Sequence, residues 1–276
     1  MSNGVICFAN NNGKVDYIKQ AVFLAKRVKQ HLNLPTSIIT STPNLITDEQ
    51  KLVFDNIIKL DHNHVNIRKY SDGALHHQKL EFKNLGRHRV FDLTPYENTL
   101  VMDTDYVLCN NTLLHAFDMS ADFMIYKNAV DLSSWRLHKE FEYINDKGIP
   151  FYWATVFFFR KTIENKIFFD LMNHIASNWN HYSKVYDLAS RNFRNDHLFS
   201  IAIHQMNGFT DNTWAKELPG KMYFILDQDR LEKIDNDKLI CLVGKKDRKG
   251  EYTIVSTNQT NVHVMNKFSF ERAIDV

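Results

Sequence analysis

Hydrophobic and polar positions follow two different periods in the first 110 residues. Short apolar runs bounded by polar residues, at 4–9, 37–40, 56–60 and 98–103, are typical of buried strands. Apolar residues recur at helical spacing over 14–33, with Lys and Arg between them, and further helices are expected at 48–54 and 74–85. Strands that alternate with helices predict a parallel sheet, as in nucleotide-binding α/β folds.

Residues 111–276 contain longer polar stretches between their apolar runs. We expect strands at 123–126 and 151–160, helices at 162–179 and 195–206, and short β-rich runs at 222–225, 239–243 and 251–255. The pattern predicts one Rossmann-like α/β domain over residues 1–276. Its central sheet should be mixed, mainly parallel and flanked by helices.

Composition narrows the class of protein. The chain has 276 residues, 44% hydrophobic and 24% charged, which excludes a disordered tail or a collagen-like chain. A net charge of +2 leaves the type of partner open. Cys7, Cys109 and Cys241 are far apart within apolar runs, so we expect reduced core residues and a cytoplasmic protein. The longest nearly apolar run, 151–159, is too short to span a membrane.

Asp103-Thr-Asp105 is the strongest candidate for chemistry. The sequence lacks the glycine-rich dinucleotide and P-loop motifs, the Gly-x-Ser-x-Gly motif and the His-Glu-x-x-His motif. In an extended chain both carboxylates point to one side, as a divalent cation and its phosphates require. The pair comes at the end of a buried strand, where open α/β sheets bind ligands. A strand-end turn capped by two carboxylates is the alternative.

Two other Asp-x-Asp triplets serve as internal controls. Asp227 and Asp229, and likewise Asp235 and Asp237, lie in polar surroundings. We expect both pairs in solvated surface loops.

The segment Pro95-Tyr-Glu-Asn-Thr-Leu-Val-Met-Asp-Thr-Asp-Tyr-Val-Leu, after an N-terminal strand and helix, resembles GT-A-fold nucleotide-sugar glycosyltransferases. This family includes glycogenin and bacterial lipopolysaccharide galactosyltransferases, and the resemblance covers nearly the whole chain. It implies a nucleotide-binding half at 1–110 and an acceptor-binding half at 111–276, which ends in a metal- and phosphate-binding segment.

The resemblance also implies a metal site. Asp103 and Asp105 would bind Mn²⁺ on the donor diphosphate, His263 would be the third ligand, and Lys267 would contact the phosphates. Around that lysine Asn266 and Phe268 replace the family's Gly and Pro-Trp. One imidazole with two carboxylates suits Mn²⁺ better than Mg²⁺, which is the alternative.

Further residues take their predicted roles from the same resemblance. Nucleotide or phosphate contacts are expected from Asn10, Asn11, Asn12, Lys79, Arg87 and Thr104. Sugar and acceptor contacts are expected from Trp153, Ala154, Thr155, Asn195 and His197, with Asp196 as the catalytic residue beside the reacting carbon. The structural alternatives are a solvated helix face for Lys79 and Arg87, an aromatic core strand for 157–159, and a helix N-terminal carboxylate for Asp196.

These residues predict transfer of a sugar from a UDP-sugar to a hydroxyl acceptor, with inversion or retention left open. Resemblance to small phage glycosyltransferases suggests hydroxymethylated pyrimidines in DNA, in the host cytoplasm. Phosphate contacts would come from Arg68, Lys69 and the basic stretches 87–89 and 245–249. A charged hairpin turn at 244–250 also explains the last stretch.

Three alternatives to this function stay open: a glycan or protein acceptor, a sugar nucleotidyltransferase, and a non-catalytic nucleotide-sugar-binding module. A nucleotidyltransferase would need a glycine-rich basic loop where Asn10-Asn-Asn-Gly-Lys14 stands. The end at Asp275-Val276 has no basic, aromatic tail, so we do not expect a lipid acceptor.

Overall fold

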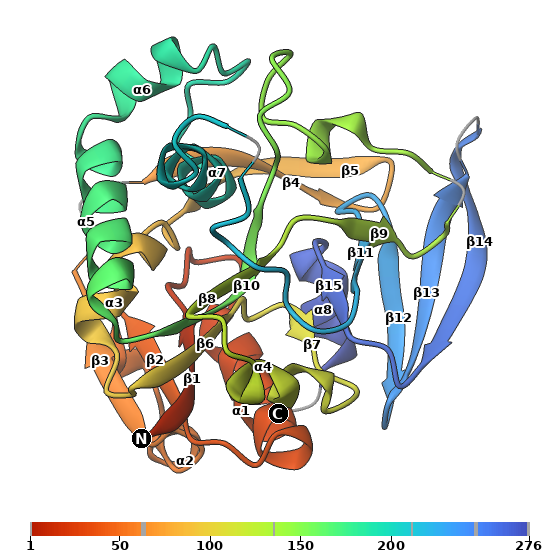
Figure 1. Ribbon diagram of the computed structural model, residues 1–276. Helices are drawn as coiled ribbons and strands as arrows, with labels where there is room; N and C mark the ends of the chain where they lie inside the picture. Colours follow the sequence, from red (N-terminus) through yellow and green to blue (C-terminus); the bar gives the residue numbers. More distant parts are fainter. Residues whose placement is uncertain (1, 62–64, 135, 211, 246–247, 275–276) are drawn as a thin grey trace.

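A computed structural model describes residues 2–61, 65–134, 136–210, 212–245 and 248–274. Its central sheet has six strands in the order β3-β2-β1-β6-β10-β8 (Figure 1). These strands are β1 (Asn3–Phe8), β2 (Thr36–Thr40), β3 (Asn56–Lys59), β6 (Asn98–Met102), β8 (Phe123–Tyr126) and β10 (Trp153–Arg160). Neighbours among β3, β2, β1 and β6 pair in parallel, whereas β10 is antiparallel to both β6 and β8. The predicted fold class, a mixed and mainly parallel α/β sheet flanked by helices, is therefore confirmed.

Helices flank this sheet. They are α1 (Tyr17–His31), α2 (Asp48–Lys51), α3 (Val90–Leu93), α4 (His115–Asp118), α5 (Ile163–Ser177), α6 (Trp179–Val185), α7 (Asn195–Met206) and α8 (Lys267–Ala273). Of these, α1, α5 and α7 bury the most residues. In β10 the side chains alternate between faces. Phe157 and Phe159 pack on Phe199 of α7 and Phe169 of α5, and Phe158 packs on Phe117 of α4. The run 157–159 is thus an aromatic core strand, as the structural alternative proposed.

Three smaller sheets flank the central one. The first has the order β7-β15-β11-β9, the second β12-β13-β14, and the third is the β4-β5 hairpin (Figure 1). Their strands are β4 (Asn66–Asp72), β5 (His76–Phe82), β7 (Tyr106–Val107), β9 (Ala129–Asp131), β11 (Met222–Ile225), β12 (Arg230–Asp235), β13 (Lys238–Lys245), β14 (Arg248–Asn258) and β15 (Val262–Val264). The pairing of β13 with β14 confirms a hairpin around 244–250, although residues 246–247 lie outside the described residues.

The predicted helix at 74–85 is wrong, because these residues belong to the β4-β5 hairpin. Gly73, with φ +80°, closes the turn, and Asp72 pairs with His76. Phe82 and Tyr70 are buried, while the outer positions of β5 are exposed. Residues of helical preference form a strand here because cross-strand pairing and burial of one face outweigh local propensity.

The cysteine prediction is confirmed, since Cys7, Cys109 and Cys241 are free and buried. No helix in the described part of the chain combines the length and the apolar character that crossing a bilayer requires.

Candidate functional site

Asp103 and Asp105 lie in the turn that follows β6. The Asp103 amide donates to the Thr155 carbonyl oxygen at 2.8 Å, and the Tyr106 amide donates to the Asp103 carbonyl oxygen at 3.1 Å. The chain then enters β7, which pairs antiparallel with β15, so that His263 lies opposite Tyr106. A strand far along the sequence thus brings an imidazole to the two carboxylates.

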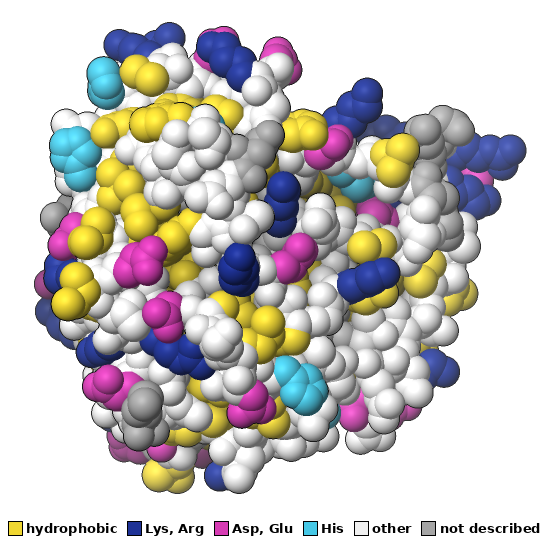
Figure 2. Space-filling model, viewed as in Figure 1, with side chains coloured by type: hydrophobic (Ala, Val, Ile, Leu, Met, Phe, Trp, Pro, Cys, Tyr) yellow, Lys and Arg dark blue, Asp and Glu magenta, His cyan; other side chains and the backbone are white. Residues whose placement is uncertain are grey.

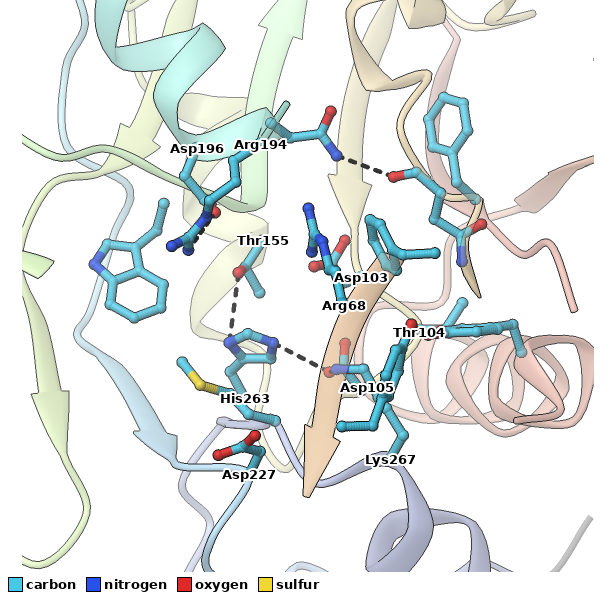
Figure 3. Close-up of a pocket in the computed structure, with 18 of the residues that line it drawn as sticks. Arg68, Asp103, Thr104, Asp105, Thr155, Arg194, Asp196, Asp227, His263 and Lys267 are labelled. Atoms are coloured by element: carbon cyan, nitrogen blue, oxygen red, sulfur yellow. Dashed lines mark hydrogen bonds and ion pairs between the residues drawn. The ribbon is translucent and has the colours of Figure 1, made fainter. Parts of the chain in front are cut away.

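The three side chains converge on one point. Each of Asp103, Asp105 and His263 offers a ligand atom, and these atoms lie within 4.8 Å of one another. His263 Nε2 is 3.1 Å from Asp105 Oδ2, and its Nδ1 is 3.5 Å from Thr155 Oγ1 (Figure 3). Two carboxylates and one imidazole fit a divalent cation, and Thr155 is placed to orient the ring that would bind it.

Two cations neutralise the carboxylates. Lys267 pairs with Asp105, and Arg87 pairs with Asp103. Burial raises the pKa of Asp103 to about 6, against the attraction of Arg87, and repulsion by Asp105 adds to the increase. Burial acts in the same direction on Asp105, but Lys267 and His263 outweigh it and hold its pKa well below the usual range. Asp105 therefore ionises before Asp103.

A cavity of about 230 Å³ opens in front of these groups. Thr104, Trp153, Thr155, Asn195 and Asp196 also line it. Figure 3 shows Asp196 and Arg194 on one side of Thr155, and His263, Asp105 and Lys267 on the other. The structure thus gathers into one cavity the three predicted metal ligands and Asp196, together with three of the seven predicted nucleotide or phosphate residues and three of the five predicted sugar or acceptor residues.

Asp196 occupies the first turn of α7. Its Oδ1 accepts from the Ala154 amide at 3.1 Å, and its Oδ2 accepts from Arg194 at 3.1 Å. Burial opposes ionisation, but the charges of Arg194 and Arg87 outweigh it and lower the pKa of Asp196. The carboxylate is therefore charged at neutral pH.

The neighbours of Asp196 differ in their placement. Asn195 donates through Nδ2 to the Asn84 carbonyl oxygen at 3.0 Å. The His197 ring does not line the cavity but lies edge-on to Phe151, and burial lowers its pKa to about 4. Ala154 is buried behind the cavity wall.

The three asparagines at the end of β1 bind protein groups. The Asn10 side chain bonds to Asn84 and Ser41, that of Asn11 to Asp16 and Ile18, and that of Asn12 to Lys14, Val15 and Glu81. These side chains do not line the cavity in front of Asp103, and Asn10 instead lines a neighbouring cavity of about 500 Å³. Lys79 is exposed on β5 and also lies outside the cavity wall.

The prediction of solvated loops for the two control pairs is wrong at three of four positions. Asp227 lines the candidate cavity, and Asp229 is fully buried and accepts two bonds from Arg136. Asp237 pairs with Arg27, whereas Asp235 is exposed. Polar neighbours in the sequence did not reveal these partners, which come from distant segments.

Sequence reasoning missed cavity residues on three segments. Arg68 reaches the cavity from β4, Arg194 precedes α7, and Asp227 follows β11. Arg68 was singled out only as a phosphate contact for DNA. A signal for Asp227 was available, because this acidic residue lies two positions after the end of the predicted strand 222–225.

Comparison with known proteins finds no matching family model and no matching curated protein. Solved structures with a similar fold include the glycosyltransferase GlyE of Streptococcus pneumoniae TIGR4, with 13% identity and a TM-score of 0.42. That match covers 79% of this chain and 45% of GlyE, so the chain spans less than half the length of that protein.

Two other solved structures match this chain with similar sequence identities and TM-scores. The galactosyltransferase LgtC, in complex with donor and acceptor sugar analogs, matches at 11% identity and a TM-score of 0.42, over 74% of this chain and 70% of that chain. A protein of Bacillus anthracis assigned as a glucose-1-phosphate thymidylyltransferase matches at 8% identity and a TM-score of 0.41, over 78% and 86%. Likeness at this level does not identify the activity of this chain.

Proposed function

We propose that this protein is a metal-dependent glycosyltransferase that moves a sugar from a nucleoside-diphosphate donor, UDP in the first instance, to a hydroxyl acceptor. The observation that carries the proposal is the convergence of Asp103, Asp105 and His263 on one point at the wall of a cavity. Lysine and arginine side chains lie beside it, as an anionic donor requires.

In this proposal Asp103, Asp105 and His263 hold the cation, and Mn²⁺ suits that donor set. The bound cation supplies neutralising charge at the departing diphosphate. Lys267 and Arg87, which pair with the two carboxylates, are the side chains placed to contact the same phosphates. Trp153 and Thr155 form the wall against which the sugar would lie.

Asp196 is the carboxylate proposed to act at the reacting carbon. Its lowered pKa, and the two hydrogen bonds that engage its oxygens, make it a weak proton acceptor. A fixed negative charge instead stabilises positive charge that develops on the sugar. We therefore propose retention of configuration, which NMR of the anomeric proton of the product would test.

The metal site can be tested by measuring UDP release from UDP-sugars with and without Mn²⁺. Replacing Asp105 with Asn should lower the Mn²⁺-dependent rate by about a hundredfold or more, because a carboxylate ligand is lost. Asp235→Asn is the matched control, since the Asp235 side chain is exposed. Equal rates for Asp105→Asn and the control would contradict the proposal.

For the acceptor we propose a hydroxymethylated pyrimidine in DNA. Exposed Lys69 lies on the cavity wall. Lys245, Arg248 and Lys249 line another cavity, of about 250 Å³, which Ala74 also lines. Ala74 lies in the turn of the β4-β5 hairpin, which also carries Lys69. Figure 2 shows Lys and Arg side chains gathered at the β13-β14 end of this face. Sugar transfer to hydroxymethylated but not to unmodified duplex DNA supports the proposal, and transfer to glycans alone contradicts it.

A further inference from the structure

Three arginines line the candidate cavity together with Asp196: Arg87 pairs with Asp103, and the other two are Arg68 and Arg194. Arg194 Nη2 is 3.1 Å from Asp196 Oδ2. Arg68 extends from β4, where its Cζ lies 3.7 Å from the centroid of the Phe82 ring. Its Nη2 approaches the Phe193 carbonyl oxygen at 3.5 Å, next to Arg194 in the chain. Both arginine side chains line the cavity (Figure 3).

This part of the cavity has more positive than negative charge. Asp196 pairs with Arg194, and its other oxygen accepts from the Ala154 amide. Among the described residues, no carboxylate forms an ion pair with Arg68. Burial and then the nearby charge of Arg194 lower the pKa of Arg68 to about 10. Two guanidinium groups beside one carboxylate leave one positive charge without a counter-ion, and a further anion can neutralise it.

Strand β10 contacts both the Asp196–Arg194 pair and the metal cluster, which is Asp103, Asp105 and His263. The Thr155 carbonyl oxygen accepts from the Asp103 amide at 2.8 Å, and its hydroxyl lies 3.5 Å from His263. The preceding residue, Ala154, donates its amide to Asp196. The two sets of side chains therefore contact adjacent residues of β10, whose Cα atoms are about 3.8 Å apart. All of them line the same cavity.

We propose that Arg68 and Arg194 form a subsite for a carboxylate on the donor sugar, so that the transferred group is a hexuronic acid. A guanidinium group presents paired N–H donors that match the two oxygens of a carboxylate. The inference rests on the proposed function, because it takes the donor diphosphate to lie at Asp103 and Asp105. The subsite lies beside Asp196, which is proposed to act at the reacting carbon of the transferred sugar. The carboxylate is therefore expected on that sugar and not on the acceptor.

Calorimetric titration with Mn²⁺ tests the subsite. UDP, UDP-glucose, UDP-glucuronic acid and UDP-galacturonic acid are compared on the wild type, Arg68→Gln, Arg194→Gln and the control Arg191→Gln, which changes an exposed arginine in the same loop. At least one uronic acid donor should bind about tenfold or more tightly than UDP-glucose to the wild type and to the control. Both cavity variants should lose most of this preference and keep their affinity for UDP.

Equal affinity of the wild type for neutral and acidic donors would overturn the inference, as would a preference that persists in both cavity variants. If the arginines instead bind an acidic acceptor, glucose 6-phosphate but not glucose should bind the complex of the protein with UDP and Mn²⁺. This binding should require Arg68, and the wild type should then show no preference among the donors. That result would also overturn the inference. If a cavity variant does not fold, the donor preference of the wild type alone decides. Failure of UDP to bind with Mn²⁺ would instead contradict the proposed function.

Discussion

At the scale of single residues, position in the fold gives identical side chains different properties. Asp103 and Asp105 are two residues apart, yet burial raises the pKa of Asp103 to about 6 while Lys267 and His263 hold that of Asp105 low. Asp196 is charged because two arginines outweigh its burial. A cation site needs such an ionised carboxylate before the metal arrives, because protons compete with metal for the same oxygens. Asp105 is therefore the first ligand available.

His197 gives a prediction for stability against pH. Burial lowers its pKa to about 4, from a usual value of 6.5, so the unfolded chain binds the proton more readily than the folded protein. The free energy of unfolding should therefore fall as the pH falls from about 6.5 towards 4. Replacing His197 with Gln removes this contribution. Relative to the wild type, the variant should gain roughly 2 kcal/mol between pH 7 and pH 5.

Urea unfolding at the two pH values measures this difference. His76→Gln is the matched control, because His76 is exposed on β5. A His197→Gln variant whose stability follows the wild type in parallel at both pH values would show that the buried ring does not oppose protonation.

At the scale of elements, apolar runs identified the strands of the central sheet and its long helices, but not the shortest strands of the smaller sheets. The bounds predicted for β8, α7 and β11 agree with the structure, because strong periodicity and clear ends coincide there. Strands β7, β9 and β15 have only two or three residues, too few for a period to be visible. The candidate site shows the same division, since the spacing of Asp103 and Asp105 is local, whereas the approach of Arg68 depends on a hairpin whose second strand was predicted as a helix.

The turn of that hairpin gives a prediction at this scale. Gly73 has φ +80°, and a Cβ there would lie 2.8 Å from the Tyr252 hydroxyl. Gly73→Ala should lower the free energy of unfolding by about 1 to 2 kcal/mol, because an L side chain strains the backbone and displaces Tyr252. Gly148→Ala is the control, with φ +78° and no atom within 4 Å of the added Cβ. Chemical denaturation should show a larger loss for Gly73→Ala, and equal losses would mean that the contact with Tyr252 costs nothing.

At the scale of the whole molecule, the candidate site depends on how separate sheets are joined. The cavity wall combines the end of β6, strand β10, the start of α7, strand β15 and the β4-β5 hairpin (Figure 1). One connection is a buried ionic cluster, defined here as Arg136, Asp131, Asp229 and His138. Arg136 pairs with Asp229 at 2.6 Å and with Asp131 at 2.8 Å, and His138 pairs with Asp131 at 2.7 Å.

Asp229 connects this cluster to two sheets. Its Oδ1 accepts from the Gly244 amide of β13 at 2.9 Å, and its Oδ2 accepts from the Leu226 amide after β11 at 2.8 Å. The position of Asp227 in the cavity wall depends on the same segment, because it lies between Leu226 and Asp229. The cluster should therefore support both the stability of the protein and the shape of the site.

Replacing Asp229 with Ala should lower the free energy of unfolding by about 3 to 5 kcal/mol, because it leaves Arg136 buried with one carboxylate fewer and leaves the backbone amides of Gly244 and Leu226 without their acceptor. Asp235→Ala, at an exposed side chain, should cost less than about 1 kcal/mol. The double variant Arg136→Met with Asp229→Ala should be less stable than Asp229→Ala alone, because buried Asp131 then loses its pairing with Arg136. Thermal and urea unfolding of the wild type and the three variants measure these differences. If Asp229→Ala costs no more than Asp235→Ala, the cluster does not join the sheets, and the site must be held by the apolar core alone.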